Sequence, residues 1–118
     1  MFDADQISIK RAYEAPDPTD GLRVLVDRLW PRGLSKADAA IDLWLRDVAP
    51  STELRQWFGH RTDRWEAFRS RYSAELQANP SFGELRALSV RRLTLVYAAK
   101  DVTHNHARVL LEHLVAKP

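Results

Sequence analysis

The spacing of hydrophobic and polar positions predicts three β-strands. Residues 6–11 alternate, with two isoleucines on one face and polar side chains on the other, which is the pattern of a half-buried strand. Residues 23–27 and 92–99 contain continuous apolar stretches rich in β-branched side chains, as in strands that are covered on both faces. The turn-forming residues at 16–21 favour a loop or a hairpin between the first two strands.

Two short helices are predicted after the second strand. Ser35, with Asp38 three residues later, has the pattern of a capping box and begins a helix in an alanine-rich segment. Ser51 caps a helix over residues 52–58. Residues 41–48 fit both the spacing of a helical face and the alternation of a strand, so the sequence leaves two alternatives there.

Three further helices are expected. Asp63, with Glu66, predicts the cap of a longer helix, and Ser81, with Glu84, offers the cap of a brief one. Thr103 is expected to cap the last helix. The stripe that the longer helix is expected to bury consists of Trp65, Phe68, Tyr72 and Leu76.

Strands mixed with capped, amphipathic helices indicate an α/β fold, in which helices cover a small, mainly parallel sheet. A length of 118 residues is typical of one domain, so residues 1–118 are expected to form a single α/β domain. In open sheets of this kind, ligands bind outside the carboxyl ends of the strands. Candidate site residues are therefore sought at those ends.

Composition and charge narrow the class of protein. Hydrophobic residues make up 45% of the chain and charged residues 29%, which excludes a disordered or low-complexity chain. Eighteen Lys and Arg against sixteen Asp and Glu are too nearly balanced for a strongly basic nucleic-acid-binding arm. The lack of cysteine excludes thiolate catalysis and disulfides. Acidic Asp3 and Asp5, and the lack of a long apolar run, predict a cytoplasmic protein that enters no membrane.

Charged residues follow the two apolar strands. Asp27 and Arg28 follow the first of them, and Lys100 and Asp101 follow the second. If these strands are parallel neighbours, the four charges gather at one edge of the sheet. The alternative is a pair of solvated ion pairs, which contribute little to stability.

Neighbouring residues favour a site for an anionic small molecule at this edge. Arg32 lies in a Pro-Gly turn, and Trp30 precedes that turn, where its ring could line a pocket. The last helix is expected to present the backbone N–H groups of Asn105 and His106 beside Lys100, and helix N-termini bind anions. The expected ligand is a phosphate, a nucleotide or a carboxylate.

Histidines near a carboxylate also allow acid–base chemistry, which leaves open whether the protein is an enzyme. Histidine side chains in general titrate near neutral pH, so His104 or His106, near Asp101, could exchange a proton. A capping or packing role is the alternative. His60 and Asp27 complete a set from which a metal site could be drawn. However, two histidines two residues apart project to opposite sides of a helix, so no metal is expected. No motif names a cofactor.

The arginine-rich segment 61–71 supports a second hypothesis, an accessory module that binds nucleic acid or protein. Arg64 and Arg71 are seven residues apart and share a helix face. Glu66 and Glu75 dilute the positive charge. Binding of nucleic acid through such a stripe would weaken steeply with salt.

Three segments carry a family resemblance, namely RVLVDRLWPRG at 23–33, APSTELR with the following Trp-Phe and His60 at 49–60, and YAAKD with HNHA at 97–107. Together they closely resemble the YeaO-like proteins, a bacterial family of unknown function. The resemblance implies a small, single-domain cytosolic protein. It supplies no activity, substrate or cofactor, and no catalytic residue.

Overall fold

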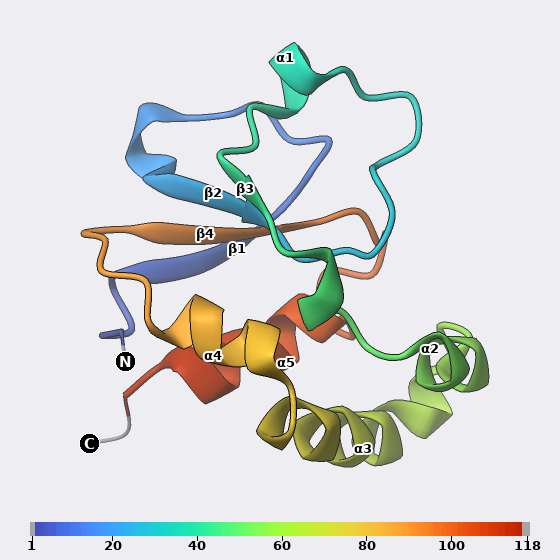
Figure 1. Cartoon of the computed structure of the whole chain (residues 1–118). Helices are drawn as coiled ribbons and strands as arrows, with labels where there is room; N and C mark the ends of the chain where they lie inside the picture. Colours follow the sequence, from blue (N-terminus) through green and yellow to red (C-terminus); the bar gives the residue numbers. More distant parts are fainter. Residues whose placement is uncertain (1, 117–118) are drawn as a thin grey trace.

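Four parallel strands form the central sheet of the computed structural model, which describes residues 2–116 (Figure 1). The strand order is β1-β4-β2-β3, and every pair is parallel. The predicted α/β class with its mainly parallel sheet is confirmed. The strands are β1 (Ile7–Arg11), β2 (Leu22–Leu25), β3 (Leu43–Trp44) and β4 (Leu93–Tyr97).

The two apolar strands, β2 and β4, lie side by side at the centre of the sheet. Leu25 is in register with Val96, and the N–H of Val26 donates to the carbonyl oxygen of Val96 at 3.1 Å. Because β4 also separates β1 from β2, the predicted hairpin alternative for the connection between them is wrong. That connection is a loop containing one 3-10 turn, Pro18–Asp20.

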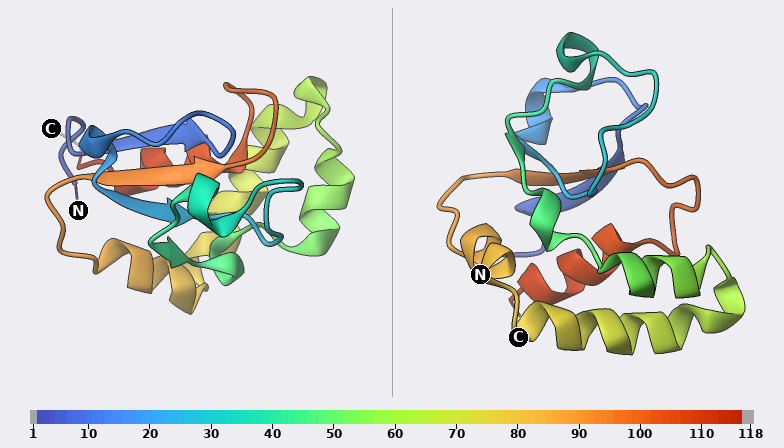
Figure 2. Two further views of the ribbon diagram at one scale, coloured as in Figure 1. Left: turned by 90° about the horizontal axis from the view of Figure 1, so that it is seen from above. Right: turned by 45° about the vertical axis from the view of Figure 1, so that its right-hand side comes forward.

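Helices cover mainly one face of this sheet. Figures 1 and 2 show α3, α4 and α5 below the sheet, and the short α1 with its flanking loops above it. No helix within residues 2–116 is both long and apolar enough to span a membrane. The helices are α1 (Lys36–Ala39), α2 (Thr52–Phe58), α3 (Trp65–Gln77), α4 (Pro80–Arg86) and α5 (His106–Leu114).

The continuous apolar runs of β2 and β4 arise because both faces of the sheet are covered. Val24 and Val26 belong to the large core that the helices complete. Leu25, whose side chain points to the opposite face, packs with Val96 and Ala12 in a smaller core beneath the loops around α1. Successive residues of a strand point to opposite faces, so each position along these strands is buried.

Residues 41–48 combine a strand and a turn. Leu43–Trp44 form β3 at the edge of the sheet, and Arg46–Val48 form a 3-10 turn. The strand alternative therefore holds for only two residues. The caps predicted at Ser35 and Ser51 are confirmed, since their side chains accept the N–H groups three residues later.

The cap predicted for α3 is wrong. Asp63 lies inside a 3-10 turn, Thr62–Arg64, and α3 begins at Trp65 with no side-chain cap. The carboxylate of Asp63 instead forms an ion pair with Arg61 at 2.9 Å, so it does not accept a hydrogen bond from the first turn of the helix.

The caps predicted for α4 and α5 are also displaced. α4 begins at Pro80, which needs no N–H partner, and its cap is Asn79 rather than Ser81. α5 is capped by Asn105, two residues after the expected Thr103. The helix starts later because the preceding residues form a turn, in which the Asp101 carboxylate accepts the N–H groups of Thr103 and His104.

A cluster of buried charges fixes the loops above the sheet. The Arg23 side chain, 5% exposed, donates to Asp20 at 2.6 Å and to the carbonyl oxygens of Ala39 and Ala40. Lys10 donates to the same carboxylate at 3.2 Å. Burial would raise the pKa of Asp20, but the N–H of Asp17 and the two cations hold this pKa below its ordinary value of 3.8.

Asp20→Asn is expected to lower the free energy of unfolding by about 3 kcal/mol, because two cations lose their buried carboxylate. A lowered pKa stabilises the fold at pH above 3.8, and this stabilisation is lost as the pH falls from there through the lowered pKa. The difference between the wild type and the variant should therefore shrink below pH 3.8. Urea unfolding above and below that pH measures it.

The control is Asp63→Asn, which removes a carboxylate from an exposed ion pair and should change stability little. Equal unfolding midpoints for the wild type and Asp20→Asn would contradict a stabilising role of the buried cluster.

Candidate functional site at the carboxyl edge of the sheet

The carboxyl ends of β2 and β4 meet at one edge of the sheet. Asp27 Oδ2 accepts a hydrogen bond from the N–H of Ala98 at 2.9 Å, so the residues that follow the two strands are in direct contact. This contact confirms that the polar residues after β2 and β4 share one edge. Lys100 and Asp101 come next in the chain after that contact.

His106, the first residue of α5, lies against the end of β2. Its Nε2 is 3.0 Å from the carbonyl oxygen of Val26 and 3.1 Å from Oδ1 of Asp27. Since both neighbours are acceptors, Nε2 carries the hydrogen and Nδ1 is the free ring nitrogen. Of the two histidines expected near Asp101, this one therefore pairs with Asp27 instead.

His104 pairs with Asp101. Its Nδ1 is 2.9 Å from Asp101 Oδ2. Its ring packs edge-on against the Trp65 ring, with 5.3 Å between the ring centres. Asp101 Oδ1 accepts the backbone N–H groups of His104 and Thr103, and these bonds hold the pKa of Asp101 below its ordinary value. The N–H groups of this loop thus already bind a carboxylate of the protein.

Arg28 is engaged within the protein. Its Nη2 is 3.3 Å from the carbonyl oxygens of both Ala49 and Pro50, and its Nη1 is 3.7 Å from Asp47. The guanidinium therefore fastens the segment before α2 to the end of β2. Fewer of the Arg28 N–H groups are therefore available to a ligand than the sequence predicts.

Two tryptophans support the loop that follows β2. Trp30 Nε1 donates to the carbonyl oxygen of Leu34, and its ring meets that of Trp44 at 5.5 Å. Trp44 Nε1 donates to the carbonyl oxygen of Asp27 at 2.7 Å. Trp30 thus packs against the small core. The sequence analysis had instead predicted that its ring lines a pocket.

Two other candidates have structural roles or lie elsewhere. Asn105 is buried and caps α5: its side chain accepts the N–H of Arg108 and donates to the Asp101 carbonyl oxygen. His60 lies in the turn between α2 and α3, with a φ of 59°, and its ring faces Phe58. The structure does not bring His60 into the set at the strand ends.

Arg11 and Tyr13, which the sequence analysis did not single out, join the loops of this edge. Arg11, the last residue of β1, donates to the carbonyl oxygens of Ala98 and Ala99. Its guanidinium lies 5.2 Å from the centre of the Tyr13 ring, and the Tyr13 hydroxyl donates to the carbonyl oxygen of Arg32. The signal was available, because Arg11 ends a predicted strand just as Asp27 follows one.

Exposed apolar side chains accompany these charges. Among residues 2–116, the exposed large hydrophobic side chains are Tyr13, Leu29 and Val102, with exposed fractions of 46%, 69% and 54%. They stand in the three segments that follow β1, β2 and β4. The edge therefore offers both cationic and apolar contacts.

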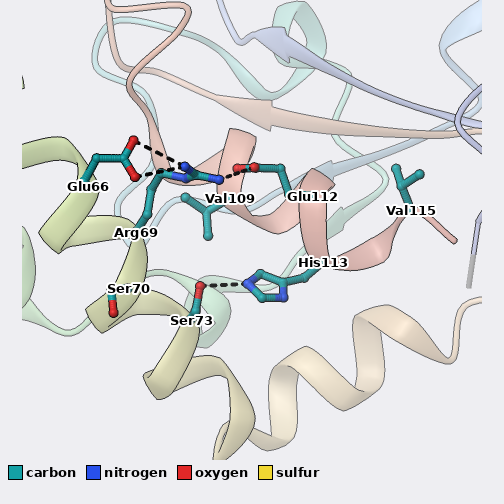
Figure 3. A pocket seen from close by; sticks show the side chains of 8 residues that line it. All are labelled: Glu66, Arg69, Ser70, Ser73, Val109, Glu112, His113 and Val115. Atoms are coloured by element: carbon teal, nitrogen blue, oxygen red, sulfur yellow. Dashed lines mark hydrogen bonds and ion pairs between the residues drawn. The ribbon is translucent and has the colours of Figure 1, made fainter. Parts of the chain in front are cut away.

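A groove of about 730 Å³ lies elsewhere, between α3 and α5. Figure 3 shows Arg69 reaching from α3 to Glu112, and Ser73 hydrogen-bonded to His113. None of the predicted site residues lines this groove. Within the described part of the chain, no three His, Asp or Glu side chains gather as a metal site would require.

Comparison with known proteins identifies relatives over nearly the whole chain. Residues 6–117 match the family model described as the inactive DUF488-N3 subclade. The uncharacterised protein Rv3073c of Mycobacterium tuberculosis is 46% identical over 97% of this chain and 98% of its own length. The uncharacterised protein YeaO of Escherichia coli is 44% identical, over 92% of this chain and 96% of its own length. No solved structure matches significantly.

Arg28→Ala is expected to lower the free energy of unfolding by about 2 kcal/mol, because two buried carbonyl oxygens lose a charged donor. Lys100→Ala, at an exposed position, should stay within about 0.5 kcal/mol of the wild type. Chemical denaturation of both variants measures the contrast. Equal stability of the two variants would show that the Arg28 contacts do not fasten the loop.

Proposed function

The chain belongs to the YeaO-like proteins, within the family described as the inactive DUF488-N3 subclade, and we propose that it binds an anionic small molecule at the carboxyl edge of its sheet. The observation that carries this proposal is the contact chain from Arg32 through Tyr13 and Arg11 to the segment before Lys100. These contacts tie the backbone at Arg32, and at Ala99 next to Lys100, to Tyr13 and Arg11, which supports a cationic site made by Arg11, Arg32 and Lys100.

The three cations lack carboxylate partners. Within residues 2–116, no ion pair to Asp or Glu involves Arg11, Arg32 or Lys100. The nearby Asp101 carboxylate is occupied by two backbone N–H groups and His104. An anion would therefore gain charge-assisted contacts without displacing a carboxylate of the protein.

The exposed apolar side chains narrow the ligand class. Tyr13, Leu29 and Val102 would bury apolar surface against a ligand that carries a nonpolar part. A carboxylate, a phosphate ester or a nucleotide with such a part fits better than a bare inorganic ion.

Titration calorimetry with inorganic phosphate, benzoate and AMP tests this proposal. We expect benzoate or AMP to bind more tightly than phosphate, and both Arg32→Gln and Lys100→Gln to weaken that binding about ten-fold, the loss typical of one charged hydrogen bond. Arg91→Gln is the matched control, because it removes an exposed arginine that follows no strand.

Unchanged affinity in Arg32→Gln and Lys100→Gln would contradict binding at this edge, and so would equal weakening in Arg91→Gln. Absence of heat with all three probes at low ionic strength would remove the predicted ligand classes.

Acid–base chemistry is the second candidate function. It is favoured by two imidazole–carboxylate pairs: His106 Nε2 lies 3.1 Å from Asp27 Oδ1, and His104 Nδ1 lies 2.9 Å from Asp101 Oδ2. A carboxylate that fixes the tautomer of a histidine is the usual partner of a general base. The family's description as inactive supports binding without turnover, so binding is the function that we favour.

The two candidates differ in the fate of the bound probe. Under binding alone, the NMR spectrum of a probe bound at this edge should remain unchanged after prolonged incubation with the wild-type protein. Conversion of the probe that is lost in His106→Asn or His104→Asn, with folding retained by circular dichroism, would instead support acid–base catalysis.

A further inference from the structure

We infer that Trp57, Arg64 and Arg71 form a second anion site, separate from the carboxyl edge, that binds phosphate groups. Trp57 belongs to α2, Arg64 directly precedes α3, and Arg71 lies in the middle of α3. The guanidinium carbons of Arg64 and Arg71 are 4.9 Å and 4.1 Å from the centre of the Trp57 ring. Two cations are thus held on one indole.

These two arginines differ from their neighbours in lacking carboxylates. Arg61 pairs with Asp63, and Arg69 pairs with Glu66 and Glu112. Within residues 2–116, no such ion pair involves Arg64 or Arg71. The arginine-rich segment is therefore neutralised at some positions and left positive beside Trp57.

The nearest acidic residue along α3 is also occupied. Glu75 is one turn beyond Arg71, and its carboxylate accepts both the N–H and the hydroxyl of Ser51. Because Ser51 caps α2, this arrangement holds the two helices together while drawing the carboxylate into the cap. Arg71 keeps its charge without this helical partner.

Stacking on an aromatic ring orients a guanidinium for anion binding. Contact with the ring uses the face of the planar group and leaves the in-plane N–H donors available. Arg64 donates one of these N–H groups to the carbonyl oxygen of Trp57. Arg71 contacts the Trp57 ring, and it takes part in none of the side-chain hydrogen bonds or ion pairs found within residues 2–116. A phosphate oxygen pair matches the donor geometry that remains.

The same stacking indicates which part of a ligand this site would recognise. The guanidinium groups lie over the indole ring and leave less of its surface for a nucleic-acid base to stack on. Recognition would therefore go through phosphate groups and would be independent of base sequence. The phosphates could belong to a free polyphosphate or to the backbone of a single strand, and the two sources are separable by experiment.

The test uses the full chain, with pyrophosphate in calorimetry and labelled dT and dA oligonucleotides of equal length in fluorescence anisotropy at low salt. We expect binding of pyrophosphate or of both oligonucleotides, with about ten-fold weaker affinity in Arg71→Gln. Arg64→Lys, which retains charge but loses the planar group, should weaken binding as well. If the ligand is a single strand, the double variant Arg64→Gln/Arg71→Gln, which removes both charges, should flatten the salt dependence by about 1.4 logarithmic units per decade for two phosphate contacts.

Arg86→Gln is the matched control, because Arg86 also lies over an aromatic ring, that of Phe82, but does so alone. The variant has the same change in net charge and should bind as the wild type does. Lys100→Gln should also retain this binding, which keeps the outcome independent of the carboxyl edge.

Pyrophosphate binding without oligonucleotide binding identifies a free polyphosphate as the ligand, and binding of both oligonucleotides with equal affinity identifies a single strand. The proposal is overturned if neither probe binds, if Arg71→Gln binds as tightly as Arg86→Gln, or if dT and dA differ strongly in affinity. Circular dichroism of Arg71→Gln and Arg64→Lys checks that any loss is not unfolding.

Discussion

The parallel pairing of β2 with β4 is the contact on which the carboxyl edge depends. It extends beyond the last residue of β2, because the Asp27 side chain accepts the N–H of Ala98 where a backbone carbonyl would otherwise be needed. The same carboxylate lies 3.1 Å from His106 at the start of α5. One side chain therefore joins two strands and a helix, and the loops that leave this edge take their positions from it.

Most polar groups at the edge serve the fold. Arg28 holds the segment before α2, Asn105 caps α5, and the Asp101 carboxylate accepts the N–H groups of Thr103 and His104 just before the helix. A buried polar group left without a partner costs about 1–3 kcal/mol, so these internal contacts come first. The groups that are left to bind a ligand are then the cations that have no carboxylate partner.

The contrast between paired and unpaired arginines recurs across the molecule. Arg23 is buried and neutralised by Asp20, and it fastens the loops above the sheet. Arg64 and Arg71 are held by an indole and no carboxylate within the described chain. A buried cation must be compensated because desolvation of a charge is costly, whereas a cation stacked at the surface keeps its charge for a partner. The same residue type thus serves stability in one place and recognition in another.

Local patterns along the chain were sufficient for the α/β class, for the two apolar strands and for the caps at Ser35 and Ser51, since each depends on neighbouring residues. The caps at Asp63, Ser81 and Thr103 were wrong because competing partners, such as Arg61 for Asp63, lie outside the capping pattern. Other contacts join segments that are far apart in the sequence, namely the pairing of His106 with Asp27 and the hydrogen bonds of Arg11. The placement of two arginines on Trp57 depends on how α2 and α3 pack. The periodicity of a sequence does not say which distant residues come into contact. The residues at the carboxyl edge of the sheet could therefore be predicted from the sequence, but their contact partners could not.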